Sequence, residues 1–182
     1  GFIGDIFAAS GYQLNFVDAA EDLVELMNQR GVYTVVRAVS ADNIQRIPVD
    51  QFKAYHVSQK EDLQRLVNEV DVIAIATFPK VFGAVATELQ QLILARRNVR
   101  PNDPLNIIVC TNLVHAGPIF STALYAGLDA EQQKYFDEKI GVVESLIIRM
   151  APPAPVEEVE KDPLVVWTNG YGEFPVDGSA FK

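Results

Sequence analysis

Residues 104–117 read PLNIIVCTNLVHAG, and this stretch decides the fold. Residues 105–110 are almost entirely apolar, which is typical of a strand covered on both faces of a parallel sheet. The run stops at Thr111 and Asn112 rather than at a glycine or proline, and a helical pattern follows at 113–127. A buried strand followed at once by a helix indicates an α/β sheet, with Thr111 and Asn112 at the carboxyl end of one strand.

The same alternation of strand and helix recurs along the chain. VDVIAIAT at 70–77 is a second apolar run, and a long helix is predicted behind it at 81–97. LNFVD at 14–18 predicts a short strand ending on Asp18, and the helix after it stops at Gly31. These elements predict an open, mostly parallel sheet of the doubly wound type, with helices on both faces.

Three β-rich stretches predict a small antiparallel meander inserted in this sheet. They lie at 32–39, 43–50 and 52–57, separated by polar turns such as SADN at 40–43. A further strand is predicted at 141–150, and the Pro- and Glu-rich stretch at 151–162 predicts an exposed loop.

Composition narrows the classes of function. The 182 residues carry a net charge of −9, which argues against nucleic-acid binding because that activity needs basic surface. The single cysteine excludes an internal disulfide and favours a cytoplasmic location. No apolar stretch is long enough to span a membrane, so no membrane partner is expected. Two isolated histidines and one cysteine give no metal-ligand spacing.

Ligands of open α/β sheets bind at the carboxyl ends of the strands, which makes Asp18, Thr77 with Phe78, and Asn112 the candidate site residues. The Asp18 carboxylate can accept hydrogen bonds from both ribose hydroxyls of adenosine and would repel a 2′-phosphate. It can equally cap the following helix. Thr77 and Phe78 can make room for a cofactor backbone or form an ordinary strand-to-helix turn.

Asn112 also has two interpretations. Its amide can donate a hydrogen bond to a carbonyl oxygen that gains negative charge during hydride transfer. Alternatively, Thr111 or Asn112 caps the helix expected at 113. We interpret Cys110 as a buried strand residue and His115 as exposed or capping.

Several stretches, in order, resemble the polyol-specific long-chain dehydrogenases, the mannitol dehydrogenase family. They are GFIG (1–4), FVD (16–18), VDVIAIATFP (70–79), PLNIIVCTN (104–112), GVVESLIIRMAPP (141–153), DPL (162–164) and VDGSAFK (176–182). The resemblance implies a Rossmann-type NAD-binding domain over residues 1–182. It implies hydride transfer between NAD(H) and a ketose, ketose phosphate or sugar acid, the small-molecule polyol or sugar-phosphate partner of the reaction.

The resemblance also assigns roles to residues. Asn112 matches the catalytic asparagine that helps to polarise the substrate carbonyl, and Asp18 matches the ribose-binding acid. The implied cofactor-binding residues are Gly1, Phe2, Asp18, Thr77, Phe78 and Asn112.

We expect parts of the family's architecture outside this chain. The family has a glycine-rich turn and a central strand before GFIG, and a helical domain that supplies a catalytic lysine. The sequence therefore predicts a sheet that lacks its first strand, truncated at the N-terminus, with the helical domain downstream of Lys182. Strands 14–18 and 70–77 would then not pair directly.

Three residues depart from the family pattern and keep a second function open. Thr111 stands where the family has an acid, Ile148 where it has an aspartate, and Phe78 where it often has a small residue. The alternative is a diverged, non-catalytic dinucleotide-binding sensor or assembly module.

Overall fold

The computed structural model describes residues 1–40 and 42–182; Ala41, in the predicted SADN turn, lies outside the described residues. The chain forms two compact units. Unit 1 comprises residues 1–60 and 148–173, and unit 2 comprises residues 61–147 and 174–182. Each unit has its own hydrophobic core.

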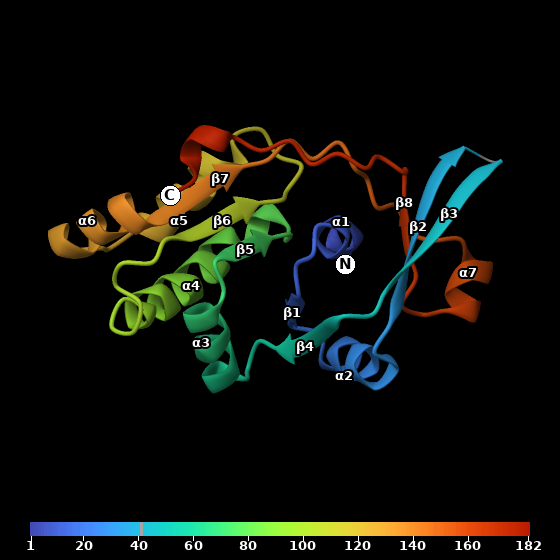
Figure 1. Cartoon of the computed structure of the whole chain (residues 1–182), viewed down its shortest axis with the longest axis horizontal. Helices are drawn as coiled ribbons and strands as arrows, with labels where there is room; N and C mark the ends of the chain where they lie inside the picture. Colours follow the sequence, from blue (N-terminus) through green and yellow to red (C-terminus); the bar gives the residue numbers. More distant parts are fainter. Residues whose placement is uncertain (41) are drawn as a thin grey trace. The chain divides into compact units, whose positions relative to one another are not determined.

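Unit 1 contains three helices and five strands among its described residues (Figure 1). They are α1 (Gly4–Ala9), β1 (Leu14–Asp18), α2 (Glu21–Arg30), β2 (Tyr33–Ser40), β3 (Asn43–Val49), β4 (Phe52–His56), α7 (Val156–Lys161) and β8 (Val166–Thr168). Strand β1 has the bounds that the sequence predicts. β1 pairs in parallel with β4, while β2 pairs antiparallel with β3 and parallel with β8.

The predicted three-stranded meander is wrong in its third strand. Only β2 and β3 pair antiparallel, and β4 pairs with β1 instead. The side chain of Asn28 on α2 explains part of this choice. It donates to the Ala54 carbonyl at 2.8 Å and accepts from the Ala54 N–H at 2.9 Å, so α2 satisfies the β4 backbone at that point.

The predicted exposed loop at 151–162 is also wrong over part of its length, because α7 forms there. Pro155 precedes the helix, Glu157 and Glu158 lie in its first turn, and Lys161 lies in its last. This distribution of charge complements the helix dipole and favours even a short helix.

The GFIG stretch packs against β2. The Tyr33 hydroxyl donates to the Gly1 carbonyl at 2.9 Å, and a Cβ on Gly4 would lie 2.0 Å from the Tyr33 oxygen. Only glycine therefore fits at position 4 with Tyr33 in this place. Tyr33 also makes edge-to-face ring contacts with Phe16 and Phe52 in the core of unit 1.

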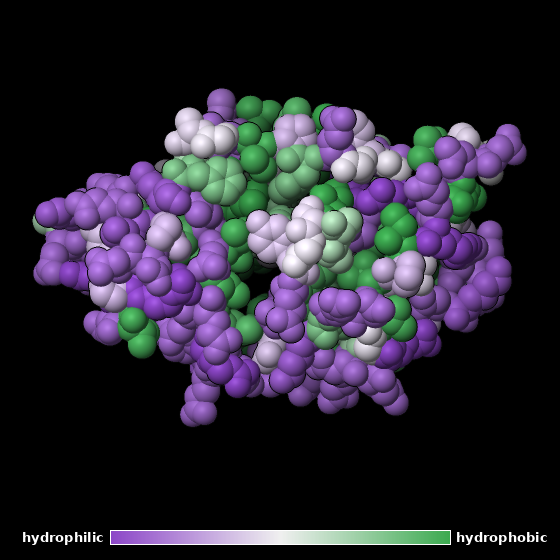
Figure 2. All heavy atoms as spheres, viewed as in Figure 1, coloured by the Kyte–Doolittle hydropathy of each residue, from purple (hydrophilic) through white to green (hydrophobic). Residues whose placement is uncertain are grey.

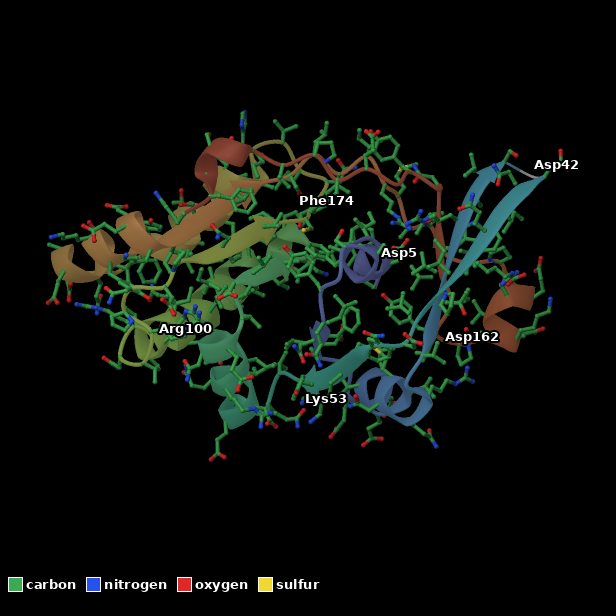
Figure 3. All side chains as sticks on the ribbon, viewed as in Figure 1. Asp5, Asp42, Lys53, Arg100, Asp162 and Phe174 are labelled. Carbon is green, nitrogen blue, oxygen red and sulfur yellow. The ribbon has the colours of Figure 1, made fainter. Side chains whose placement is uncertain are left out.

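A buried charge cluster joins α1, β2 and the segment after Ile147. Asp5 lies on α1 (Figure 3). Its side chain is 0% exposed and lies 2.6 Å from Arg37 Nη2 and 2.9 Å from Arg149 Nη1. Arg149 is itself buried, and its Nη2 also donates to the Thr168 hydroxyl at 3.3 Å. The single carboxylate therefore compensates two guanidinium groups.

Unit 2 contains the three-stranded sheet β5–β6–β7. Its elements are α3 (Lys60–Glu69), β5 (Val72–Ile75), the 3-10 turn η1 (Pro79–Val81), α4 (Phe82–Arg96), β6 (Leu105–Val109), α5 (Ala116–Tyr125), α6 (Ala130–Lys139), β7 (Ile140–Glu144) and the 3-10 turn η2 (Gly178–Ala180). Strand β6 lies between β5 and β7, parallel to both (Figure 1). Every residue of β6 is buried, as its apolar sequence predicts.

The helices of unit 2 contribute apolar residues to the core that they share with this sheet. In α3 the buried residues are Leu63, Leu66 and Val67, and in α6 they are Tyr135 and Phe136. The charged residues of α6 face outward and form the hydrophilic surface at the left of Figure 2. The loops that follow β6 and β7 surround the carboxyl ends of these strands.

Within the described residues, β1 pairs only with β4 and β5 pairs only with β6. The expectation that strands 14–18 and 70–77 do not pair directly concerns strands of two different units and stays a prediction. The parallel sheets and intervening helices confirm the predicted α/β, Rossmann-type class. None of the described helices is long and apolar enough to cross a membrane.

Candidate functional site

A cavity of about 520 Å³ opens at the carboxyl ends of β6 and β7 in unit 2. Three short segments line it: the turn after β6, the end of β7 with the residues beyond it, and part of the C-terminal segment. Their residues are Thr111, Asn112, Leu113, Val114, His115, Glu144, Ser145, Leu146, Ile147, Pro175, Val176 and Asp177. This is where open α/β sheets bind their ligands.

The turn after β6 is held by Thr111 rather than by a helix cap. The Thr111 hydroxyl donates to the Thr77 carbonyl at 2.9 Å, which ties the ends of β5 and β6 together. Helix α5 begins only at Ala116, and His115 before it makes no side-chain cap. The interpretation of Thr111 or Asn112 as a helix cap is therefore wrong.

Asn112 is exposed and lines the cavity. Within the described part of the chain, its side-chain amide has no hydrogen-bond partner. An amide without a partner at the mouth of a cavity retains both donors for a ligand. Its assignment as the catalytic asparagine stays a prediction, and the geometry is compatible with it.

His115 has the one positive φ among the described non-glycine residues, with φ 59° and ψ 33°. This left-handed conformation is uncommon for a residue with a Cβ and clusters at ligand sites. His115 is exposed, and its conformation directs the chain from the Asn112 turn into α5. No pattern in the sequence predicts this backbone conformation.

Sequence reasoning missed three further polar residues of the cavity. Glu144 ends β7, and the Ser145 hydroxyl donates to the Val109 carbonyl at 2.7 Å, linking β7 to β6. Asp177 accepts from the Ser179 N–H and hydroxyl, and these bonds lower the pKa of its carboxyl group. Glu144 would have been a candidate, as a residue at the carboxyl end of a strand, if the strand predicted at 141–150 had been predicted to end at 144.

Cys110 lies just before this turn and is buried, as predicted. Burial raises the pKa of its thiol to about 12, so the thiol stays protonated at neutral pH. Because only the thiolate is a nucleophile, we expect a water-soluble disulfide reagent to modify folded protein at least ~100-fold more slowly than urea-unfolded protein. Equal rates in the two states, measured by release of the reagent's chromophore, would contradict the buried placement of Cys110.

Asp18 lies at the carboxyl end of β1 in unit 1 and is exposed. Its Oδ1 accepts from the Ala20 N–H at 2.9 Å, but the N-cap of α2 is Ala20 itself, without a side-chain cap. Beside it, His56 Nε2 lies 3.1 Å from the Ala19 carbonyl oxygen. Asp18 therefore orders the turn before α2 and still presents its carboxylate to solvent.

The remaining predicted cofactor residues divide between the units. Gly1 and the half-buried Phe2 precede α1 in unit 1. In unit 2, Thr77 and Phe78 follow β5, and Phe78 is 76% exposed with Lys80 Nζ 5.9 Å from its ring centre. Thr77 adjoins the Asn112 turn through Thr111, whereas Phe78 does not line the cavity.

In the ranges 1–40 and 42–182, no three His, Cys, Asp or Glu side chains are grouped so that they could hold a metal ion. What the cavity can offer a ligand is an amide without a partner, an imidazole, two carboxylates and an apolar wall.

Curated relatives match along the whole chain. Mannitol-1-phosphate 5-dehydrogenases of Lacticaseibacillus casei and Lacticaseibacillus paracasei are each 28% identical over 183 residues. The match covers 100% of this chain and 46% of each relative, so the chain spans about half the length of the curated relatives it matches.

Solved structures give the same fold. D-sorbitol dehydrogenase in substrate-free form is similar with a TM-score of 0.76 and 12% identity, covering 97% of this chain and 46% of that one. Pseudomonas fluorescens mannitol 2-dehydrogenase, in ternary complex with NAD and D-mannitol, is similar with a TM-score of 0.66 and 12% identity, covering 89% and 42%.

The family profile described as the mannitol dehydrogenase Rossmann domain matches residues 1–182, which is the whole chain. The strand order, the strand-end cavity and this match agree. The chain therefore belongs to the mannitol dehydrogenase family, as a Rossmann domain of that family.

Proposed function

We propose that this chain is the NAD-binding portion of a polyol dehydrogenase. The reaction is reversible: a hydride passes from the carbon of a CH–OH group to the nicotinamide, the hydroxyl proton passes to a base, and a ketose or ketose phosphate forms. The observation that carries the proposal is the cavity at the ends of β6 and β7, with the amide of Asn112 in its lining and without a partner. Asn112 would orient the carbonyl oxygen by donating a hydrogen bond to it.

The residues of the chain fit the cofactor. Asp18 offers an exposed carboxylate to the adenosine ribose, and the unit 2 cavity is large enough for a nicotinamide ring. NAD supplies the hydride acceptor when bound. The names of the relatives support a polyol or polyol phosphate as the substrate, of the mannitol 1-phosphate and fructose 6-phosphate type.

Two further parts complete the proposed enzyme. The chain spans 46% of the length of its curated relatives, and the family resemblance implies a central strand with a glycine-rich turn at its end as one of these parts. A helical domain, as the family resemblance implies, would supply the lysine that acts as acid and base. The helical domain would then be a partner of this one within the same protein.

The carboxylate of Asp18 leads us to predict that the protein prefers NAD to NADP. In the full-length protein, NAD should bind at least ~10-fold more tightly than NADP, because the Asp18 carboxylate would lie against the 2′-phosphate in a partly desolvated site. Asp18→Asn should reduce this preference, and calorimetric titration with both cofactors measures it. Asp22→Asn, an exposed acid on α2, serves as the matched control and should leave the preference unchanged. Equal affinity for NAD and NADP in the unmodified protein would discard Asp18 as the ribose ligand.

The second candidate function is a non-catalytic dinucleotide-binding module. Two observations favour it: Thr111 is occupied by its bond to Thr77, and Ile148 places an exposed aliphatic side chain where the family has an aspartate. A protein that binds NAD but converts no polyol would support this alternative.

A further inference from the structure

Glu144 contributes to the cavity a carboxylate that forms no ion pair among the described residues. It is half-buried at the end of β7 and lines the cavity. Among the described residues its side chain has no hydrogen-bond or salt-bridge partner. Its position is built into the fold, since a Cβ on Gly117 would lie 2.9 Å from the Glu144 Cβ, so the side chain passes close to the first turn of α5.

The other charges around the cavity do not offset it. Asp177, the second acid of the lining, keeps its carboxyl pKa low through Ser179. None of the described lining residues is Lys or Arg, and His115 is the one side chain there that can carry a positive charge. The cavity therefore favours a cationic ligand group over a neutral one of the same shape.

We propose that Glu144 makes this site discriminate between the two oxidation states of the cofactor. The inference rests on the proposed function, in which the nicotinamide occupies this cavity. The nicotinamide ring carries a positive charge in NAD⁺ and becomes neutral when it accepts the hydride. The Glu144 carboxylate attracts the first form and is indifferent to the second, so it strengthens NAD⁺ binding relative to NADH binding.

This preference has a consequence for the direction of the reaction. Because the bound oxidised form is stabilised, the equilibrium between bound reactants shifts toward NAD⁺ and therefore toward ketose reduction. Glu144 acts here as a specificity-determining residue, whereas Asn112, in the same lining, would donate to the substrate oxygen. The two roles make different predictions, since the loss of a neutral donor does not discriminate between the charged and the neutral form of the nicotinamide ring.

The test is to titrate the full-length protein with NAD⁺ and with NADH, separately, and to repeat both titrations with Glu144→Gln. We expect the Kd of NAD⁺ to rise roughly 3- to 30-fold, because one charge at close range is removed from a site open to solvent. The Kd of NADH should stay within about twofold, since the charge term in the same Coulomb relation is absent for a neutral ring. Glutamine keeps the shape of the side chain and breaks no described hydrogen bond.

Two control variants sharpen the result. Glu144→Asp keeps the charge and should restore most of the NAD⁺ preference, whereas Glu138→Gln removes an exposed acid from α6 and should change neither Kd. Equal shifts of both Kd values, or none, in Glu144→Gln would overturn the inference while leaving NAD binding intact. Failure of the unmodified protein to bind either cofactor would instead overturn the proposed function, and the inference with it.

Discussion

Replacing Asn112 with alanine in the full-length protein is expected to lower kcat by about 10²-fold or more, because a donor aimed at the developing oxyanion is removed. Cofactor affinity should change much less than turnover. Stability should change little, since the amide has no partner among the described residues and α5 begins four residues later, at Ala116. Turnover and thermal unfolding measured on the same preparation separate these effects.

Asn102→Ala is the matched control for this prediction. Asn102 is an exposed asparagine in the turn before β6 and should tolerate the change with unaltered turnover. Near-normal turnover in Asn112→Ala would remove Asn112 from the reaction and leave it as a residue of the turn.

Replacing Asp5 with asparagine is expected to lower the free energy of unfolding by about 3–5 kcal/mol, because it leaves a buried charge without compensation. Arg149 is buried, and Asp5 is the one carboxylate in contact with it among the described residues. Arg37, 21% exposed, also loses its partner but can still reach solvent. Urea denaturation of the variant and the parent protein measures the difference.

The control for Asp5 is an ion pair at the surface. Glu138→Gln breaks the Lys134–Glu138 pair on α6, whose side chains are 75% and 56% exposed, and should cost under about 1 kcal/mol. A loss below about 1 kcal/mol for Asp5→Asn as well would mean that water or another group reaches Arg149.

Features set by local sequence were predictable. The bounds of β1 and the burial of β6 follow from short apolar runs that a sheet must cover on both faces. Asn112 lines a cavity at the carboxyl end of β6, where its position after the apolar run placed it. Gly31 ends α2 with a positive φ, as its position after the helical pattern indicates.

Features set by distant contacts were not predictable. The pairing of β4 with β1 depends in part on Asn28, more than twenty residues away in sequence. The buried face of α2 is a second example, since Val24 is buried and Leu23 is exposed. Leu23 and Val24 are both apolar, so their pattern alone does not show which one faces the strands.

Glu144 and Asp177, the cavity acids that the sequence did not predict, were missed for related reasons. Glu144 sits in an apolar run that continues through Leu146 and Ile147, so the strand looked longer than it is. Asp177 reaches the cavity because its segment returns along β7, with Val176 bridged to Ser145. That return is a tertiary contact, and nothing in the sequence around residue 177 indicates it.

The central claim is that this Rossmann domain works in an NAD-dependent polyol dehydrogenase. The most direct test is to mix the full-length protein with NAD⁺ and, in turn, the polyols and polyol phosphates of the proposed reaction, and to follow NADH by its absorbance. We expect NADH to form with at least one of them, and we expect the rate with Asn112→Ala to be lower by about 10²-fold or more. A protein that binds NAD⁺ and reduces it with none of these substrates would contradict the account and would identify the domain as a binding module.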